Sequence, residues 1–268
     1  MANSNLQAAK AAKKDEFYTQ FNDIQKEIQA YLDYNVGVFK DKVVYCNCDD
    51  PFESNFFRYF VLNFKKLGLK QLITTSYKPS PVANTQLVLF GNDKTVKKSK
   101  GQPKITANKF VINEVYDIDA NGEYNLKDVA EQLKANKNNE WAPLQEDGDF
   151  RSKECVELLK QANIVVTNPP FSLFREYLKQ LMECDKKFVI IGNMNAVTYK
   201  EVFPLIKENK VWFGPSISSG DREFQVPDEY QLNAAGWRID EDGKKYLRIK
   251  GVRWFTNLDH GRRHQPLN

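Results

Sequence analysis

The chain has 268 residues, of which 41% are hydrophobic and 28% charged, and these proportions are ordinary for a globular protein. A chain of this length can bury one large core, which favours one main domain with a smaller appendage. No apolar run approaches the roughly 18 residues that a membrane-spanning helix needs, and residues 1–14 are too polar for a secretory signal. We therefore expect a cytoplasmic protein that does not bind membranes.

Basic residues collect in two stretches, although the 39 basic residues are nearly matched by 35 acidic ones and the net charge is only +4. Six lysines and no acid lie between Lys94 and Lys109, and seven basic residues with one acid lie between Lys244 and Arg263. Such stretches suit a phosphate backbone. The alternative to phosphate binding, for either stretch taken alone, is that its charges lie on solvent-exposed loops.

The chain contains four cysteines, at positions 46, 48, 155 and 184. Only Cys46 and Cys48 are close together, and a C-x-C pair without further Cys or His nearby is a poor zinc site. We expect reduced thiols and no bound metal.

Helical and strand patterns alternate along most of the chain, after a frayed tail expected over residues 1–14. The predicted helices are Phe17–Tyr34, Phe56–Leu67, Cys155–Gln161, Leu173–Met182 and Tyr199–Asn209. Gly68 is placed to end the second helix, and Pro204 should kink the last one or delay its start. The predicted strands are Val43–Cys46, Leu72–Thr75, Ile164–Thr167, Phe188–Ile191 and Val211–Phe213. Apolar strands separated by helices predict a doubly wound α/β fold, a mostly parallel sheet covered on both faces.

The stretch 78–141 breaks this alternation. It holds the lysine cluster, β-rich segments at 110–112 and 115–116, a turn signal at Asn121-Gly122 and a helical pattern at Leu126–Leu133. We predict a small β-rich, basic subdomain inserted after the second strand. The main domain would then comprise residues 15–77 and 142–268.

The tetrapeptide Asn168-Pro169-Pro170-Phe171 follows a predicted buried strand and precedes a helix, and ligands bind at this end of the strands in open α/β sheets. The two prolines fix the backbone and remove two N–H donors. The Asn168 side-chain oxygen and the Pro169 carbonyl would accept the two hydrogens of an amino group, while Phe171 stacks on its ring. This arrangement favours a planar ring with an amino group as substrate. The alternative is a turn that merely ends the strand.

Several longer stretches resemble the EcoRI-type adenine-specific DNA methyltransferases. They are Asp15–Gln20, Val43–Phe60, Gly148–Ser152, Ile164–Leu178, Tyr199–Phe203 and Trp254–Asp259. The resemblance covers nearly the whole chain outside the 78–147 region. It implies a Rossmann-like class I methyltransferase fold, S-adenosylmethionine as methyl donor, and double-stranded DNA as substrate in a restriction-modification setting. The relatives are expected to continue beyond the point where this sequence stops.

The resemblance also implies roles for individual residues. Tyr18 and Thr19 match a motif that closes over the methionine part of the donor. Asn47 and the segment Asp49-Asp50-Pro51 follow the first strand, where an acidic group can hold the donor's ammonium. Asp49 and Asp50 would otherwise cap a helix N-terminus.

The remaining matches concern the two adenine rings. Asp149 and Phe150 match the segment that reads the donor's adenine, and Asn168–Phe171 match the pocket for the target base. The sequence departs from the common methyltransferase pattern in two places: residues 43–63 contain no glycine, and no acid follows Thr74-Thr75-Ser76-Tyr77 to hold the donor's ribose.

The resemblance implies transfer of a methyl group to N6 of a flipped-out adenine, and we expect a monomer that uses neither a metal nor a covalent intermediate. No cysteine stands in the proline-cysteine turn that C5 methylation of cytosine would use. Three alternatives stay open: methylation of RNA or of a protein glutamine amide, methylation of cytosine N4, and a DNA-binding relative that has lost catalysis. The Gly- and Ser-rich stretch 213–224 is expected to form a loop at the DNA face.

Overall fold

The computed structural model describes residues 17–48, 54–77, 107–117, 128–129, 131–132, 138–226 and 236–266. Four predicted features lie outside these residues: the tail 1–14, the segment Asp49–Pro51, most of the lysine cluster and the Asn121-Gly122 turn.

A central sheet of eight strands has the order β4-β3-β2-β1-β5-β6-β11-β7. Its strands are β1 (Val43–Cys46), β2 (Gln71–Thr75), β3 (Asn108–Ile112), β4 (Glu140–Pro143), β5 (Ile164–Thr167), β6 (Lys187–Asn193), β7 (Trp212–Phe213) and β11 (Val252–Thr256). The four central strands β2, β1, β5 and β6 are parallel, whereas β3 and β11 run antiparallel to their neighbours. The predicted doubly wound, mostly parallel sheet is therefore confirmed.

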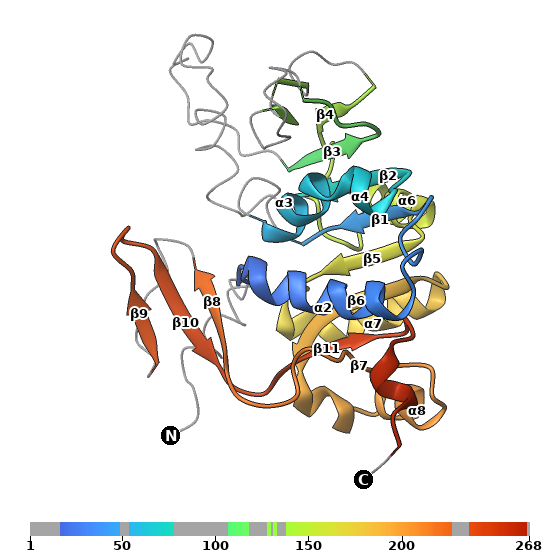
Figure 1. Ribbon diagram of the computed structural model, residues 1–268, viewed down its shortest axis with the longest axis vertical. Helices are drawn as coiled ribbons and strands as arrows, with labels where there is room; N and C mark the ends of the chain where they lie inside the picture. The colour runs from blue at the N-terminus through green and yellow to red at the C-terminus, as the bar shows by residue number, and fades with distance from the viewer. Residues whose placement is uncertain are drawn as a thin grey trace.

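Helices cover both faces of the sheet, as side-chain alternation along the strands requires. On one face α2 (Phe21–Tyr34) and α3 (Asn55–Leu62) pack against residues such as Val44 and Val166. On the other face α6 (Lys153–Gln161) and α7 (Phe174–Glu183) pack against the alternate residues Tyr45 and Val165. Figure 1 shows α2 running across one face of the sheet. The two apolar cores hold the central strands in place.

The short elements complete the chain. The helices α4 (Phe64–Leu67) and α8 (Phe203–Lys207) are each about one turn long. The described residues also form the 3₁₀ helices η2 (Phe171–Leu173), η3 (Met194–Thr198) and η4 (Gly261–His264). All four cysteines are free thiols, as predicted. None of the helices in the described part of the chain is long and apolar enough to cross a lipid bilayer.

Three helix boundaries differ from the predictions. Phe17 lies outside the helix, and the next residue, Tyr18, pairs with Gln225 of strand β8 (Arg222–Val226). The second predicted helix is split at Asn63 into α3 and α4, and Gly68 ends it in a left-handed conformation with φ +63°. The helix predicted over Tyr199–Asn209 begins only at Phe203, with Pro204 in its first turn, so the predicted delay is confirmed.

The stretch predicted as an insertion contributes to the main sheet. The strand β3, predicted in part as 110–112, pairs with β2, and β4 pairs with β3, so both extend the sheet at one edge. Residues 115–116, predicted as a strand, form none. The described residues 128–129 and 131–132 are helical, in agreement with the predicted helix. The limits of the insertion itself stay a prediction.

A second, three-stranded antiparallel sheet was not predicted. Its order is β8-β10-β9, with β8 (Arg222–Val226), β9 (Trp237–Ile239) and β10 (Lys245–Ile249). We call this sheet the arm. In Figure 1 it extends at the left of the view, beside the ends of the central strands. The backbones of Tyr18 and Gln225 exchange two hydrogen bonds of 2.9 and 3.1 Å, which join the arm to the segment before α2.

Candidate active site

A recess opens where the carboxyl ends of β1, β2 and β5 meet. The register aligns these ends, since Val44 lies opposite both Leu72 and Ile164. The recess is lined by Cys48, Tyr77, Gly148, Asp149, Phe150, Pro170 and Leu173. The structure thus brings Asp149 and Phe150, predicted to read the donor's adenine, together with Pro170 of the predicted catalytic tetrapeptide.

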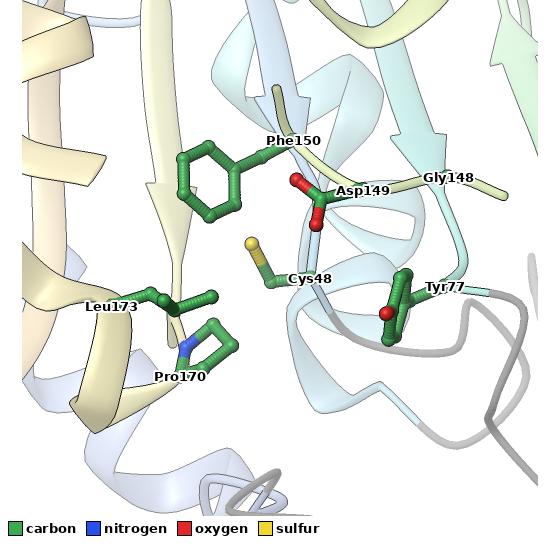
Figure 2. Close-up of a pocket in the computed structure, with 7 residues that line it drawn as sticks. All are labelled: Cys48, Tyr77, Gly148, Asp149, Phe150, Pro170 and Leu173. Atoms are coloured by element: carbon green, nitrogen blue, oxygen red, sulfur yellow. The ribbon is translucent and has the colours of Figure 1, made fainter. Parts of the chain in front are cut away.

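The Phe150 side chain is held firmly at one wall of the recess (Figure 2). Its ring packs edge-on against Tyr177 with centroids 5.0 Å apart, and its carbonyl accepts a hydrogen bond of 3.0 Å from Gln180. Burial raises the pKa of Tyr177 well above its usual value, so this phenol stays neutral. A fixed apolar ring at the wall of a recess is suited to stacking on a flat ligand.

Asp149 presents a carboxylate beside that ring. Both of its oxygens accept hydrogen bonds from Arg151, Oδ1 from Nε at 2.8 Å and Oδ2 from Nη2 at 2.6 Å. A second acid, Glu176, holds the other end of the same guanidinium at 2.8 Å. The hydrogen bonds that Arg151 donates to the Asp149 carboxylate raise the pKa of Arg151, which therefore stays charged. The backbone nitrogen of Arg151 also donates to Oδ1 at 2.9 Å, so Arg151 orients this carboxylate, and a carboxylate is an acceptor of the type that suits an amino group.

Asn168 follows β5 and is 4% exposed. Its Nδ2 donates a hydrogen bond of 2.5 Å to the carbonyl oxygen of Phe17, while its Oδ1 is buried and has no hydrogen-bond partner. Buried acceptors are nearly always satisfied, so an unpartnered oxygen two residues before Pro170 of the recess marks a candidate site for an external donor. The side chain is thus fixed at its nitrogen, and its oxygen has no hydrogen-bond partner within the described residues.

Phe171 lies at the centre of an aromatic cluster. Its ring meets Phe17 edge-on at 6.0 Å and Phe224 of the arm at 6.4 Å, and Phe17 and Phe224 are themselves 6.0 Å apart. Aromatic rings in such edge-on contact fix each other's planes. The arm therefore contacts the end of the predicted catalytic tetrapeptide directly.

Tyr18 and Thr19, predicted to close over the donor, lie next to this cluster and are both buried. Tyr18 is paired with Gln225 through its backbone, and the Thr19 carbonyl accepts a hydrogen bond of 2.8 Å from Asn55. The Thr19 hydroxyl oxygen is buried without a partner. The structure places both residues near the tetrapeptide, and their contacts with the donor stay a prediction.

Asn47 is buried and makes two contacts within the protein. Its carbonyl oxygen accepts a hydrogen bond from the Thr167 hydroxyl, and its Oδ1 accepts one from the Tyr177 hydroxyl. These bonds link the end of β1 to β5 and α7. Contacts within the protein therefore explain why Asn47 is buried, and no ligand is needed to explain it. Its predicted contact with the donor stays a prediction, as do those of Asp49, Asp50 and Pro51.

Sequence reasoning missed four residues of the recess: Cys48, Tyr77, Gly148 and Leu173. Cys48 and Tyr77 come directly after the strands β1 and β2, so the rule that ligands bind at the carboxyl ends of strands could have identified them. Gly148 and Leu173 adjoin predicted site residues. Figure 2 shows the Cys48 sulfur and the Asp149 carboxylate on the same side of the recess as the Phe150 ring.

Several basic residues of the C-terminal stretch are used within the protein. Arg263 pairs with Asp259 at 2.8 Å and lies over the Trp212 ring at 3.5 Å, and Arg262 donates to the Pro215 carbonyl at 3.0 Å. In the first stretch, Lys109 pairs with Glu140 at 2.8 Å. No group of three or more His, Cys, Asp or Glu within the described ranges is arranged to hold a metal ion.

Comparisons with known proteins agree with this geometry. The family described as "Adenine-specific methyltransferase EcoRI" matches residues 5–268. The chain is 45% identical to the Type II methyltransferase M.EcoRI of Escherichia coli over 99% of its own length and 72% of that relative. It is 34% identical to M.MpnI of Mycoplasma pneumoniae and 33% identical to M.MgeORF184P of Mycoplasma genitalium, in each case over 93% of its own length and 63% of the relative. No solved structure matches the chain significantly.

Proposed function

This chain belongs to the EcoRI family of adenine-specific methyltransferases, and from this membership we propose that it transfers a methyl group from S-adenosylmethionine to N6 of adenine in double-stranded DNA. The observation that carries the proposal is the buried, unpartnered Oδ1 of Asn168, two residues before Pro170 at the wall of the recess. We further propose that the protein acts as a monomer in the cytoplasm, where bacterial DNA is located.

The recess carries groups whose chemistry suits the adenine end of the methyl donor. Phe150 offers an apolar ring for stacking, and Asp149 offers a carboxylate for the amino group. Tyr18, Thr19 and the segment around Asp49 and Asp50 would hold the methionine end. When bound, S-adenosylmethionine supplies an electrophilic methyl group on a sulfonium.

The protein's own part in the reaction is to position the target and to stabilise charge. The amino group of adenine is a weak nucleophile because its lone pair is delocalised into the ring. Asn168 Oδ1 and the Pro169 carbonyl would accept its two hydrogens, which draws the nitrogen towards tetrahedral geometry and frees the lone pair. Acceptors fixed in advance stabilise the positive charge that develops on this nitrogen. The contact between Asn168 Nδ2 and Phe17 provides that fixation.

Asn168 takes no proton at neutral pH, so we assign it no role as a general base. The extra proton of the methylated amine would leave to solvent after the transfer. A target inside a duplex must first leave the base stack, which costs a few kcal/mol. Phe171, supported by Phe17 and Phe224, is the ring on which the extruded base would stack.

The variant Asn168→Ala tests this proposal. It should bind S-adenosylmethionine as the wild type does but transfer methyl groups about 100- to 1,000-fold more slowly, the usual effect of removing one fixed hydrogen-bonding group that stabilises a transition state. The measurements are calorimetric titration and transfer of radiolabelled methyl groups to DNA. Near-normal turnover would refute the assignment of Asn168. Transfer to RNA or protein in parallel assays, with none to DNA, would refute DNA as the substrate.

A further inference from the structure

The arm has two faces that differ in chemistry. In antiparallel strands, directly paired residues point to the same face. Leu247 pairs with both Phe224 and Trp237, and Lys245 pairs with both Val226 and Ile239. We call the face that carries these residues the inner face. Its members in the described strands are Arg222, Phe224, Val226, Trp237, Ile239, Lys245, Leu247 and Ile249.

The inner face begins at the proposed catalytic pocket and continues beyond the body of the protein. Phe224 is buried and its ring contacts Phe171. Leu247, in the middle strand, is also buried. At the outer strand β9, however, Trp237 is 49% exposed and Ile239 is 50% exposed. The apolar surface that supports the catalytic tetrapeptide thus extends outward to two large residues facing solvent.

The charge on this face has one sign. Its charged members are Arg222 and Lys245, both basic. Glu223 lies on the opposite face, where it pairs with Arg238 at 2.6 Å. The acids of the arm's tip, Asp240 to Asp242, lie in the turn after β9. Nucleic-acid strands bind surfaces on which an aromatic residue lies among apolar and basic neighbours. The bases stack on the aromatic ring, and the basic side chains attract the phosphates.

We propose that the inner face of the arm is a DNA-contact surface, on which Trp237 and Ile239 pack against nucleotides flanking the target adenine. This inference rests on the proposed function. Phe171 is the ring on which the extruded base would stack, and Phe224 of the arm contacts this ring with centroids 6.4 Å apart. The flanking duplex therefore meets the outer part of the same face. Because Trp237 contributes contact area and no charge, its removal should weaken binding without changing the number of phosphates neutralised.

The test compares Trp237→Ala with Phe203→Ala. Phe203 is 56% exposed and lies on α8, at the other end of the molecule from the arm in Figure 1. The ligand is a fluorescent duplex that carries the site methylated in cells expressing the protein. Trp237→Ala should bind it about tenfold more weakly, within the range for losing one base–aromatic contact, with an unchanged slope of affinity against salt. Phe203→Ala should match the wild type, and both variants should bind S-adenosylmethionine normally.

Two outcomes would overturn this inference while leaving the proposed function intact. One is wild-type duplex affinity in Trp237→Ala. The other is a wild-type protein that sediments as a dimer and a Trp237→Ala variant that sediments as a monomer, because the face would then be covered by a second copy. If the wild type itself neither binds nor methylates duplex DNA, the proposed function fails.

Discussion

Asn168 is oriented by a backbone carbonyl 151 residues earlier in the chain. An asparagine amide can rotate so that either end faces a ligand, and a donor facing the target amine would repel it. The Phe17 carbonyl can accept only from Nδ2, and it therefore directs Oδ1 to the other side. The Tyr18–Gln225 pairing next to it holds that carbonyl in place.

Gly148 is required by its close approach to a neighbouring strand. Its φ is +77°, and a Cβ atom there would lie 2.0 Å from the Ser76 carbonyl oxygen. We expect Gly148→Ala to lower the free energy of unfolding by more than the roughly 1–2 kcal/mol that a left-handed alanine costs. The displaced backbone should also weaken binding of S-adenosylmethionine, because Asp149 and Phe150 follow directly. Urea unfolding and calorimetric titration measure the two effects.

The matched control is Gly243→Ala. Gly243 has a nearly equal φ of +79°, but a Cβ atom there has no neighbour within 4 Å. This variant should show only the backbone cost and normal binding of S-adenosylmethionine. Equal losses in the two variants would mean that the contact with Ser76 is unimportant.

For single residues, the sequence indicated which side chains the site contains better than it indicated which residues those side chains contact. The tetrapeptide at Asn168 was predicted from its residue types, its position after a strand and a family resemblance, whereas the pair Asp149 and Phe150 was predicted from the resemblance alone. The partner of Asn168 was not, since nothing in the sequence around Phe17 indicates which side chain its carbonyl will meet. Phe17 itself was placed on a helix, because its spacing continues the apolar stripe of α2.

Among the elements, α2 is joined to the loop after β7 by a buried acid. Glu27 is fully buried, and it accepts hydrogen bonds from the Tyr31 hydroxyl at 2.6 Å and the Ser216 backbone nitrogen at 2.9 Å. Gly214 permits this approach, since a Cβ atom there would lie 1.9 Å from the Glu27 Oε1. The loop then leads into the arm. Glu27 therefore anchors the base of the arm to the helix that follows Phe17.

Burial raises the pKa of Glu27 above its ordinary value of 4.5, although the hydrogen bonds from Ser216 and Tyr31 oppose the shift. The folded protein therefore holds this proton more tightly than the unfolded chain does. The resulting stability is fully present below pH 4.5 and is lost as the pH rises through the raised pKa. Glu27→Gln removes the titration and keeps an acceptor, so its stability relative to the wild type should increase from pH 5 to pH 8.

Urea unfolding at the two pH values measures this difference. Glu241→Gln, at an exposed position of the arm, serves as the control and should show much less dependence on pH. A Glu27→Gln variant that lost stability relative to the wild type as the pH rose would contradict the assigned direction of the pKa shift.

The sequence predicted the central elements because each parallel strand is apolar throughout and lies between two helical stripes. It missed the arm because β8, β9 and β10 are short, carry several charges, and gain their apolar partners only on pairing. It also missed β11, whose residues Val252–Thr256 complete the sheet beside β6. The strands β9, β10 and β11 follow one another through short turns with no helix between them, so the alternation that revealed the core gives no signal for them.

For the molecule as a whole, the site is assembled from segments distant in the chain: the stretch before α2, the ends of β1 and β2, the turn at Gly148 and the end of β5. A ligand that binds only this assembled state stabilises it by about 2.7 kcal/mol at 100 times its dissociation constant. S-adenosylmethionine should therefore raise the melting temperature. Asp149→Ala should lose most of this increase, as followed by differential scanning calorimetry.

The control for this measurement is Asp33→Ala, which removes an exposed carboxylate of α2. Its melting temperature should rise with S-adenosylmethionine as much as that of the wild type. An undiminished rise in Asp149→Ala would show that the donor's amino group is held elsewhere.

The contact between Phe17 and Asn168 also sets an order of events during synthesis on the ribosome. The first segment of the site leaves the exit tunnel early, but its partner strand β8 is translated only after the whole parallel core. Until then the Phe17 carbonyl lacks the pairing that holds it, and Asn168 has no fixed orientation. A nascent chain can therefore pair its four parallel strands before Asn168 is oriented for methyl transfer.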